Sequence, residues 1–395
     1  MARIVKTSVC IVGSGPSGLL LSQLLGNEGI ETVILDRQNR QYIESRIRAG
    51  VLEQGTVDAL EEAGLADRLH QEGLIHEGFE LAFDGDRHRI DLKGLTGKTV
   101  TVYGQTEVTK DLFNRREIAG QRFFFDVANV TFEDIKSAKP RVNFEQNGEA
   151  ITIDCDYVAG CDGFRGVSRH AIPSNVLKTF ERVYPFGWLG ILTERPPVNH
   201  ELIYANHEHG FALASQRSPT RSRYYIQCKV MDKVEDWPDD RFWEELSRRL
   251  GSKTAGKLVT GPSFEKSIAQ LRSFVAEPMR YGSLFLAGDA AHIVPPTGAK
   301  GLNLAIADIR VLSRALIEHY KNKKDTYLDN YSELVLKRVW KVERFSWQLT
   351  TLMHQFPENS PFEKRMQRAN FDYISSSEAA SRSIAENYIG LPLEI

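Results

Sequence analysis

Residues 11–18 read IVGSGPSG, which places the pattern G-x-G-x-x-G at Gly13, Gly15 and Gly18. In a turn between a strand and a helix, the first glycine permits the tight bend and the second lets a pyrophosphate approach the backbone. The third allows the helix to pack closely on the strand, and unpaired N–H groups at the start of the helix bind an anion. With the intervening Ser14 and Ser17, this turn is predicted to bind the phosphates of a dinucleotide.

The segments on either side of the turn fit a β-α-β unit. Thr7–Val12 and Thr32–Leu35 are short β-branched runs typical of buried strands, and Ser17–Asn27 between them has helical spacing. Asp36 ends the second run, where a carboxylate can accept hydrogen bonds from ribose hydroxyls. Because the turn, the helix and the carboxylate occur in this order, we predict a Rossmann-like domain instead of an isolated glycine turn.

Composition excludes several classes of function. The formal net charge is −2, from 50 Lys and Arg against 52 Asp and Glu, so no global charge favours nucleic acid or an anionic membrane. The four cysteines form no C-x-x-C pair, which predicts reduced thiols. With no signal-peptide pattern and no long apolar run, we expect a soluble, cytoplasmic protein.

Two further motifs specify the nucleotide. DYVAGCDG (residues 156–163) reads as a buried strand ending in Asp162 and Gly163, and LFLAGDAAH (residues 284–292) as a second strand ending in Gly288 and Asp289. PPTGAKGLN (residues 295–303) follows. In this order the motifs resemble the three fingerprints of the single-component flavoprotein aromatic hydroxylases, which implies FAD.

That resemblance also implies how the cofactor is held. Asp289 contacts the ribityl chain, and the backbone of residues 301–303 points a helix N-terminus at the flavin, where a positive dipole end favours the reduced anion. Beyond the glycine turn and Asp36, the cofactor residues that it implies are Arg48, Gln105, Asp162, Arg223, Asp289, Gly301, Leu302 and Asn303.

The fold that follows is α/β, or α+β overall, with a Rossmann-like FAD-binding domain, a mostly antiparallel sheet for the substrate and C-terminal helices. The sheet is predicted because residues 184–230 are rich in aromatic and β-branched residues with alternating patterns. We expect the FAD domain at residues 1–76, 98–180 and 268–315, the sheet domain at 77–97 and 181–267, and a helical interface region at 316–395.

The pyridine nucleotide that reduces the flavin has no Rossmann unit of its own, because no second G-x-G-x-x-G lies on a β-α-β pattern. We therefore expect it to bind transiently at the surface. The candidates for contacting it are Arg37, Tyr42, Arg46, Arg48, Arg165, Arg169 and Arg272, each with the alternative of a solvated surface charge. Arg37 and Tyr42 follow Asp36 as in NADPH-using relatives, so NADPH is expected, with NADH as an alternative.

The substrate signal lies in the predicted sheet. Alternate residues of a strand share a face, so Ser215 and Arg217 point the same way, as do Arg223 and Tyr225. With residues 218–222 as the hairpin loop, Arg217 pairs with Arg223 and Ser215 with Tyr225. Facing guanidiniums need a nearby anion, and arginines with flanking hydroxyls fit a carboxylate. The alternative is a polar sheet face whose arginines point into solvent.

Further stretches resemble the family members that hydroxylate 4-hydroxybenzoate. They are SRIRAGVLEQG (45–55), VYGQTEV (102–108), YPFGWLG (184–190), ELIYANH (201–207), RSRYY (221–225) and AENYIGLP (385–392). The resemblance spans nearly the whole chain. It implies conversion of 4-hydroxybenzoate to 3,4-dihydroxybenzoate with NADPH and O2, through attack of a flavin hydroperoxide on the substrate phenolate.

Carried over residue by residue, the resemblance assigns the substrate carboxylate to Ser215, Arg217 and Tyr225. Tyr204 hydrogen-bonds the phenolic oxygen and Tyr388 continues that chain. His76 exchanges the proton with solvent, since histidine titrates close to working pH. Pro296 contributes backbone contacts beside the reacting ring, and Arg223 also stabilises the position of the flavin.

Several alternatives remain at this point. His207 and His209 alternate on an expected turn without a third ligand, so no metal site is predicted. His292 is expected to be structural, and Lys300 to be a loop charge or a charge near a phosphate. One rival function is a related hydroxylase of another substituted benzoate, and another is a non-catalytic FAD-fold binding protein. Aromatic residues of the C-terminal helices favour a homodimer.

Overall fold

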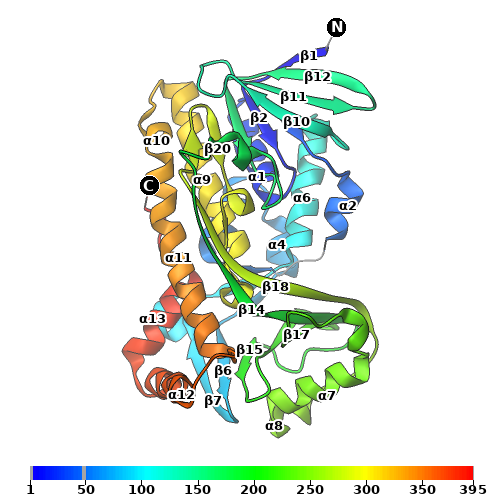
Figure 1. Ribbon diagram of the computed structural model, residues 1–395, viewed down its shortest axis with the longest axis vertical. Helices are drawn as coiled ribbons and strands as arrows, with labels where there is room; N and C mark the ends of the chain where they lie inside the picture. Colours follow the sequence, from blue (N-terminus) through cyan, green and yellow to red (C-terminus); the bar gives the residue numbers. More distant parts are fainter. Residues whose placement is uncertain (1–2, 47–49, 395) are drawn as a thin grey trace.

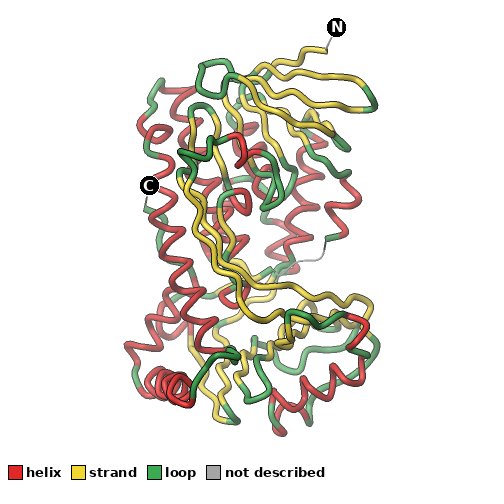
Figure 2. The backbone as a smooth tube through the Cα atoms, in the orientation of Figure 1, coloured by secondary structure: helices red, strands yellow, loops and turns green. Residues whose placement is uncertain are grey.

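The computed structural model describes residues 3–46 and 50–394. Within these ranges the chain forms an elongated molecule with sheets toward both ends of its long axis, and helix α11 (Tyr331–Met353) runs beside both (Figure 1). Strands and helices intermix in the upper half, whereas a large sheet dominates the lower half (Figure 2). The fold class agrees with the α/β, α+β prediction.

A largely parallel sheet of order β19-β20-β13-β2-β3-β9 organises the upper half. Its strands are β2 (Val9–Val12), β3 (Thr32–Leu35), β9 (Arg122–Phe124), β13 (Tyr157–Gly160), β19 (Arg280–Tyr281) and β20 (Leu284–Leu286). The helices of this half include α1 (Pro16–Asn27), α6 (Gln105–Ile118) and α9 (Gly301–Asn322). Every residue of β2 and β3 is buried, as expected for parallel strands covered by helices.

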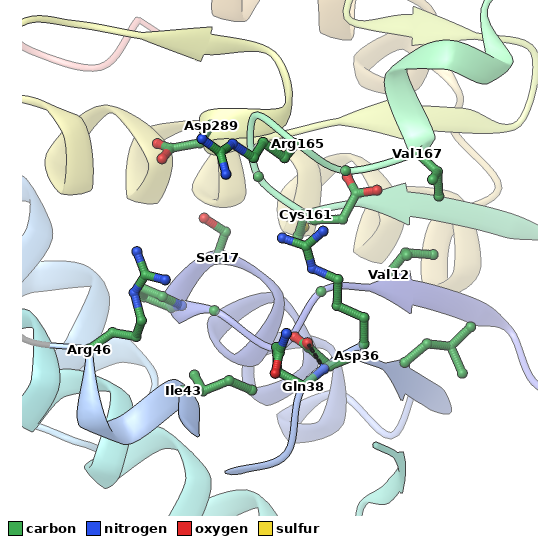
Figure 3. A pocket seen from close by; sticks show the side chains of 18 of the residues that line it. Val12, Ser17, Asp36, Gln38, Ile43, Arg46, Cys161, Arg165, Val167 and Asp289 are labelled. Carbon is green, nitrogen blue, oxygen red and sulfur yellow. Dashed lines mark hydrogen bonds between the residues drawn. The ribbon is translucent and has the colours of Figure 1, made fainter. Parts of the chain in front are cut away.

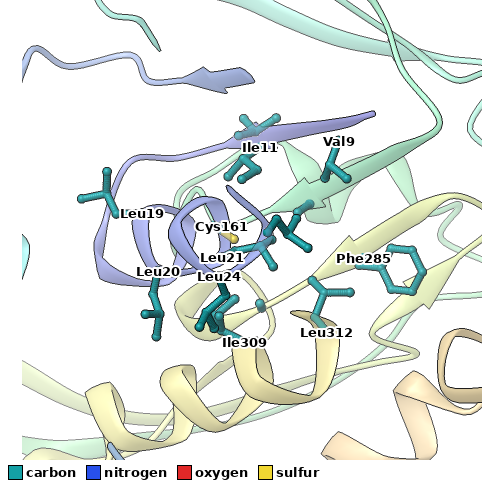
Figure 4. Close-up of a cluster of buried hydrophobic side chains, with 14 of the residues drawn as sticks. Val9, Ile11, Leu19, Leu20, Leu21, Leu24, Cys161, Phe285, Ile309 and Leu312 are labelled. Carbon is teal, nitrogen blue, oxygen red and sulfur yellow. The ribbon is translucent and has the colours of Figure 1, made fainter. Parts of the chain in front are cut away.

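The core of the upper half lies between α1, α9 and this sheet (Figure 4). Leu21 and Leu24 of α1 meet Ile309 and Leu312 of α9, with Phe285 of β20 beside them. Burying a leucine or isoleucine side chain contributes about 1.5–3 kcal/mol. This packing holds the start of α1 against the end of β2, where the glycine turn lies.

The predicted strand Thr7–Val12 is shorter in the structure because the chain changes sheets. The Thr7 N–H donates to Asp154 in one sheet, whereas the Val9 N–H donates to Glu31 in the next (both 3.1 Å). The first of these sheets has the order β1-β12-β11-β10. Its strands are β1 (Arg3–Lys6), β10 (Ala128–Glu133), β11 (Arg141–Gln146) and β12 (Glu149–Asp154).

The lower half is a sheet of order β21-β18-β14-β17-β16-β15-β6-β7, antiparallel except where β6 pairs with β15. Its strands are β6 (Gly78–Phe83), β7 (Asp86–Asp91), β14 (Lys178–Thr193), β15 (Ile203–Asn206), β16 (Ala212–Ser218), β17 (Arg221–Lys229), β18 (Ser263–Glu277) and β21 (His292–Ile293). β14 and β18 run from one half into the other (Figure 1) and cross the expected boundaries at residues 181 and 268.

Helices cover both faces of the lower sheet. On one face, Trp243 of α7 (Asp239–Leu250) packs on Tyr224. On the other, α11, α12 (Pro361–Ser376) and α13 (Glu378–Ile389) enclose Tyr204 and Tyr388.

The shorter elements are α2 (Arg40–Ser45), α3 (Gln54–Glu62), α4 (Asp67–Glu72), α5 (Leu92–Thr96), α8 (Ser252–Ala255), α10 (Thr326–Asp329), β4 (Val51–Leu52), β5 (Leu74–His76) and β8 (Val100–Val102). Within residues 3–46 and 50–394, no helix has the length and apolar character needed to span a membrane.

Candidate active site

A cavity of about 520 Å³ lies beside the glycine turn. Ser17 of α1, Asp36 at the end of β3 and Asp289 of η3 (Gly288–Ala290) border it (Figure 3). The predicted cofactor residues that line it are Gly13, Gly15, Ser17, Asp36, Gln105, Asp162, Asp289, Gly301 and Leu302. Residues from distant parts of the sequence therefore meet at one cavity.

The glycine turn has the shape that a bound dinucleotide requires. Gly13 has φ +107°, and a Cβ there would overlap the Cys161 carbonyl. A Cβ at Gly18 would overlap the Gly13 carbonyl, so the helix packs on the turn only with glycine. Gly15 borders the cavity with open space beside it, and no side chain caps the N-terminus of α1. The α1 N–H groups are thus available to a pyrophosphate.

Two carboxylates at the cavity differ in their surroundings. Asp36 Oδ2 accepts from the Ser14 backbone N–H and hydroxyl at 2.7 and 2.8 Å, which holds the turn against β3. Asp162 Oδ2 accepts from the Ser168 N–H at 2.9 Å. Its Oδ1 is buried without a partner among residues 3–46 and 50–394, and burial raises the pKa of this carboxyl. An unpaired acceptor on a residue that lines the cavity is a candidate partner for a ligand hydroxyl.

Other predicted cofactor residues lie outside the cavity lining. Ser14 and Gly18 are part of the glycine turn but do not line the cavity. The Asn303 amide clamps the α9 N-terminus, since Oδ1 accepts from the Glu53 N–H (2.9 Å) and Nδ2 donates to Val51 (2.9 Å). Arg223 belongs to the lower sheet, and Arg48 lies outside the described residues.

The candidates for the pyridine nucleotide occupy different positions in the structure. Arg37, Tyr42, Arg46 and Arg165 line the same cavity and are exposed. Arg272 forms an ion pair with Glu181 (2.9 Å) and stacks on Phe164.

The surface position expected for Arg169 is wrong. Its side chain is buried and donates to the carbonyls of Ala290 (2.7 Å) and Phe164 (2.8 Å). This arginine therefore ties two loops together from inside the protein.

The expected register of the β16–β17 hairpin is also wrong. Ser215 pairs with Arg223 and Leu213 with Tyr225, and a bulge at Arg217 displaces the ladder. The extra residue of a bulge re-aims its side chain, so Arg217 still approaches Tyr225. Because the register differs by two residues, Ser215, Arg223 and Tyr225 keep the common face that the sequence predicted.

The two arginines have different partners. Arg223 forms an ion pair with Glu265 (2.6 Å) and lies over the Tyr225 ring, 5.0 Å from its centroid. Arg217 has no carboxylate ion-pair partner in the described part of the chain, and its Nε is buried without a hydrogen bond. Burial lowers the pKa of Arg217. Glu265 therefore neutralises Arg223 through a direct ion pair, whereas the Arg217 guanidinium can pair with the carboxylate of a ligand.

A pair of tyrosines lies on the same face of the sheet. The Tyr204 and Tyr388 hydroxyls are 2.9 Å apart and buried, and burial raises the pKa of both. Tyr204 pairs with Leu213, which pairs with Tyr225, so the three form one row across β15, β16 and β17. Neighbouring strands lie about 4.8 Å apart, so the backbones of Tyr204 and Tyr225, two strands apart, are separated by roughly 10 Å.

His76 differs from its prediction. Its side chain is 0% exposed, and neither ring nitrogen has a hydrogen-bond partner among the described residues. Burial lowers the pKa of His76 to about 4, so it does not titrate near neutral pH. Direct exchange with solvent is therefore not available from this position. The exposed ring of His200 lies 5.5 Å from it, centroid to centroid.

The Gly/Pro loop presents Pro296 at the surface and buries Lys300. The Lys300 ammonium donates to Glu53 (2.7 Å) and to the Tyr388 carbonyl (2.6 Å), so this residue, expected as a loop charge or a charge near a phosphate, forms a buried ion pair where the loop joins α9. The Glu53 partner stands 247 residues away. A lysine at the N-cap of α9 gives no local sign of such a partner, and Glu53 was missed for that reason.

The remaining histidines give no evidence for a metal site in the described residues. Among the described residues, no group of three or more His, Cys, Asp or Glu is arranged to hold a metal ion. His209 lies 3.5 Å from Glu245, and His292 hydrogen-bonds Asp308 (2.6 Å) in the core, which agrees with a structural role for His292.

Comparisons with known proteins extend these observations. The profile of a family described as FAD binding domain matches residues 6–346. The p-hydroxybenzoate hydroxylase of Acinetobacter baylyi is 57% identical over 394 residues, covering 100% of this chain and 97% of that enzyme. The 3-(3-hydroxy-phenyl)propionate/3-hydroxycinnamic acid hydroxylase of Mycolicibacterium gilvum is 25% identical over 322 residues, or 78% of this chain and 53% of that protein.

A solved structure matches the whole chain. The p-nitrophenol 4-monooxygenase PnpA of Pseudomonas putida superimposes with a TM-score of 0.83 over 98% of both chains, at 20% identity. At that identity the likeness shows the fold alone.

Proposed function

The chain belongs to the FAD-binding-domain family of flavoprotein aromatic hydroxylases, and from this premise we propose that it converts 4-hydroxybenzoate to 3,4-dihydroxybenzoate with NADPH and O2. The 57% identity to p-hydroxybenzoate hydroxylase over the full chain supports this substrate. The observation that carries the proposal is the Arg217 guanidinium, which has a buried Nε and no carboxylate ion pair among the described residues and lies close to Tyr225, on the sheet face that also holds the Tyr204 and Tyr388 pair.

The spacing of these groups suits a para-substituted benzoate. Arg217, Ser215 and Tyr225 bind the substrate carboxylate at one end, through charge-assisted hydrogen bonds to a buried guanidinium. Tyr204 lies on β15, the strand next to β16, and hydrogen-bonds the phenolic oxygen of the substrate. A separation of roughly 10 Å between the backbones of Tyr204 and Tyr225 accommodates one benzene ring between their side chains.

Tyr204 and Tyr388 control the phenolic proton. The raised pKa values keep both tyrosines protonated, so Tyr204 can donate to a phenolate oxygen. A phenol near pKa 10 is mostly protonated at neutral pH, and donation to its anion lowers that pKa. Tyr204 donates to the phenolate oxygen while its own oxygen accepts from the Tyr388 hydroxyl, 2.9 Å away, and both contacts stabilise the substrate anion. The ring becomes electron-rich at the carbon ortho to the oxygen.

FAD fits the cavity beside the glycine turn. The α1 N-terminus would hold the pyrophosphate, Asp36 the adenosine ribose, Asp162 and Asp289 further hydroxyls, and the α9 N-terminus the flavin. Bound FAD, reduced by the nicotinamide, supplies the electrons that activate O2. The protein fixes the ring beside it and excludes water, since Tyr204, Tyr388 and Ser215 are all buried.

Rival substrates fit this face less well. A substituted benzoate without a para hydroxyl leaves Tyr204 without a partner for its donated hydrogen bond. A non-catalytic FAD-fold protein has no use for a buried tyrosine pair beside an uncompensated arginine, which lowers stability without a ligand.

We further propose NADPH as the reductant, bound through the exposed Arg37, Tyr42, Arg46 and Arg165 at the cavity. Arg272 and Arg48 remain further candidates, whereas the buried Arg169 does not. A cytoplasmic homodimer is also proposed. The exposed Trp340 and Trp347 of α11, 42% and 46% accessible, support a subunit contact at the C-terminal helices. The division into an FAD domain, a sheet domain and a helical region remains part of this proposal.

One experiment tests the function directly. Purified protein with FAD is mixed with 4-hydroxybenzoate and either NADPH or NADH, and the product and peroxide are quantified. We expect 3,4-dihydroxybenzoate, substrate-stimulated oxidation of the nicotinamide and a higher kcat/KM with NADPH. A panel of 3-hydroxy- and 4-aminobenzoate tests the rival substrates. If none of these acids stimulates oxidation of the nicotinamide, only the hypothesis of a non-catalytic FAD-fold binding protein remains.

A further inference from the structure

A buried histidine lies beneath both ends of the proposed substrate face. His354 stands at the end of α11 with 0% exposure, stacked between Phe186 and Phe211 at centroid distances of 4.7 and 4.3 Å. Trp188 of β14 stacks on Phe211 at 4.9 Å. Trp188, Phe211 and His354, here called the His354 cluster, belong to β14, the β15–β16 connection and the end of α11.

Hydrogen bonds specify the protonation state of His354. The Trp188 indole N–H donates to Nε2 at 2.7 Å, which requires a lone pair on Nε2. Nδ1 lies 2.9 Å from the Thr350 carbonyl and must carry the proton, since a carbonyl only accepts. His354 is therefore a neutral acceptor, and burial, which lowers its pKa to about 3, keeps it so. The indole ring of Trp188 is held in one orientation.

The His354 cluster touches both proposed substrate contacts. Trp188 packs on Tyr225, with ring centroids 5.0 Å apart, and Phe211 lies 6.2 Å from Tyr204. The Tyr225 ring lies directly over Gly190, where a Cβ would stand 2.6 Å from its Cε1. Tyr225 is thus confined by Trp188, Gly190 and the Arg223 guanidinium.

The same helix also reaches the Gly/Pro loop. One turn before His354, the Thr350 hydroxyl lies 2.9 Å from that of Thr297, which follows Pro296. α11 therefore connects the loop at the proposed reacting edge with the residues under the carboxylate and the phenol. A rigid helix that contacts all three keeps their separations constant.

We propose that His354 is a positioning residue for substrate selectivity: its hydrogen bond to Trp188 sets the spacing of Tyr225 and Tyr204, and so the preference for a para-hydroxylated benzoate. The inference rests on the proposed function, because it assigns no separate ligand. His354 itself touches no reacting atom, and it acts through Trp188 and Phe211. The sequence offers no sign of this role, since Trp188 and His354 are 166 residues apart.

Three substitutions in the full-length FAD-bound protein test the role. His354→Leu leaves the Trp188 N–H without an acceptor, and Trp188→Phe removes the donor. His354→Gln retains an acceptor oxygen. The matched control is Trp243→Phe, because the Trp243 indole also donates a buried hydrogen bond, to Gly261 (2.9 Å), but packs on Tyr224 on the opposite face.

The measurement is the selectivity ratio, Kd for 3-hydroxybenzoate divided by Kd for 4-hydroxybenzoate, determined by titration calorimetry. We expect a fall of about fivefold to tenfold in H354L and W188F, the factor that one net hydrogen bond supplies. The ratio in H354Q should recover to within about twofold of that in the unmodified protein. The ratio in W243F should equal that in the unmodified protein, although both tryptophan variants lose stability.

Each outcome decides the inference. An unchanged ratio in W188F overturns it even where H354L does not fold. An equal fall in W243F overturns it as well, since loss of stability alone would then account for the effect. If the unmodified protein binds neither acid, the proposed function fails, and the positioning role fails with it.

Discussion

Replacing Arg217 by methionine removes one buried positive charge and keeps an unbranched side chain of similar reach. In the ligand-free protein this charge has no carboxylate partner among the described residues, and its Nε makes no hydrogen bond. Burial lowers the pKa of Arg217, so its charge is less well stabilised there than in water. The substitution should therefore change ligand binding and stability in opposite directions.

The magnitude follows from the burial of the pair that the substrate completes. Truncating one partner of a buried, hydrogen-bonded charge pair costs about 2–5 kcal/mol. At 25 °C this range corresponds to a Kd for 4-hydroxybenzoate roughly 30-fold to 5000-fold higher. Without ligand, the variant should be at least as stable as the unmodified protein, because no native ion pair is broken.

Titration calorimetry with 4-hydroxybenzoate measures the first effect, and thermal unfolding without substrate measures the second. Arg221→Met is the matched control, since Arg221 lies in the same hairpin but is exposed and paired with Glu194. Surface pairs contribute about 0–1 kcal/mol, so its Kd should change little. A Kd for R217M within about threefold of the unmodified value would remove Arg217 from the carboxylate site.

Three further predictions follow from other contacts. Tyr204→Phe should retain flavin reduction by NADPH but yield peroxide in place of 3,4-dihydroxybenzoate, since it breaks the 2.9 Å pair with Tyr388; an unchanged product yield per NADPH would contradict this. Gly13→Ala should abolish FAD retention, because its Cβ overlaps the Cys161 carbonyl at φ +107°, whereas Gly64→Ala, with φ +72° and open space, serves as a control for backbone strain; yellow, FAD-loaded G13A protein would refute the fit. Burial raises the pKa of Glu343 from 4.5 to about 7, so the unfolded chain ionises first and stability falls between pH 4.5 and 7. Glu343→Gln should therefore be more stable than the unmodified protein by about 3 kcal/mol at pH 8 and equally stable at pH 4, and parallel unfolding profiles across this range would show that Glu343 is ionised in the native state.

Local patterns predicted much of the fold and the cofactor site. The segment Thr32–Leu35 and the start of α9 at Gly301 match their predictions, because glycine turns and β-branched runs act through neighbouring residues. The hairpin register was wrong because a bulge at Arg217 depends on packing across β16 and β17, which no local pattern records. His76 was expected to exchange a proton with solvent, but it is buried, and its burial depends on segments from several parts of the chain.

The sequence by itself determined the dinucleotide turn, because Gly13, Gly15 and Gly18 act within a single turn and helix. It also determined the common face of Ser215, Arg223 and Tyr225, because side chains alternate along any strand. Only the tertiary structure decided which arginine is neutralised, since Glu265 reaches Arg223 from another strand and leaves Arg217 for an anion. It likewise decided the Lys300 contact with Glu53 and the Trp188 contact with His354. Such contacts join residues far apart in sequence, and the free energy of a buried charge or hydrogen bond depends on partners that only folding supplies.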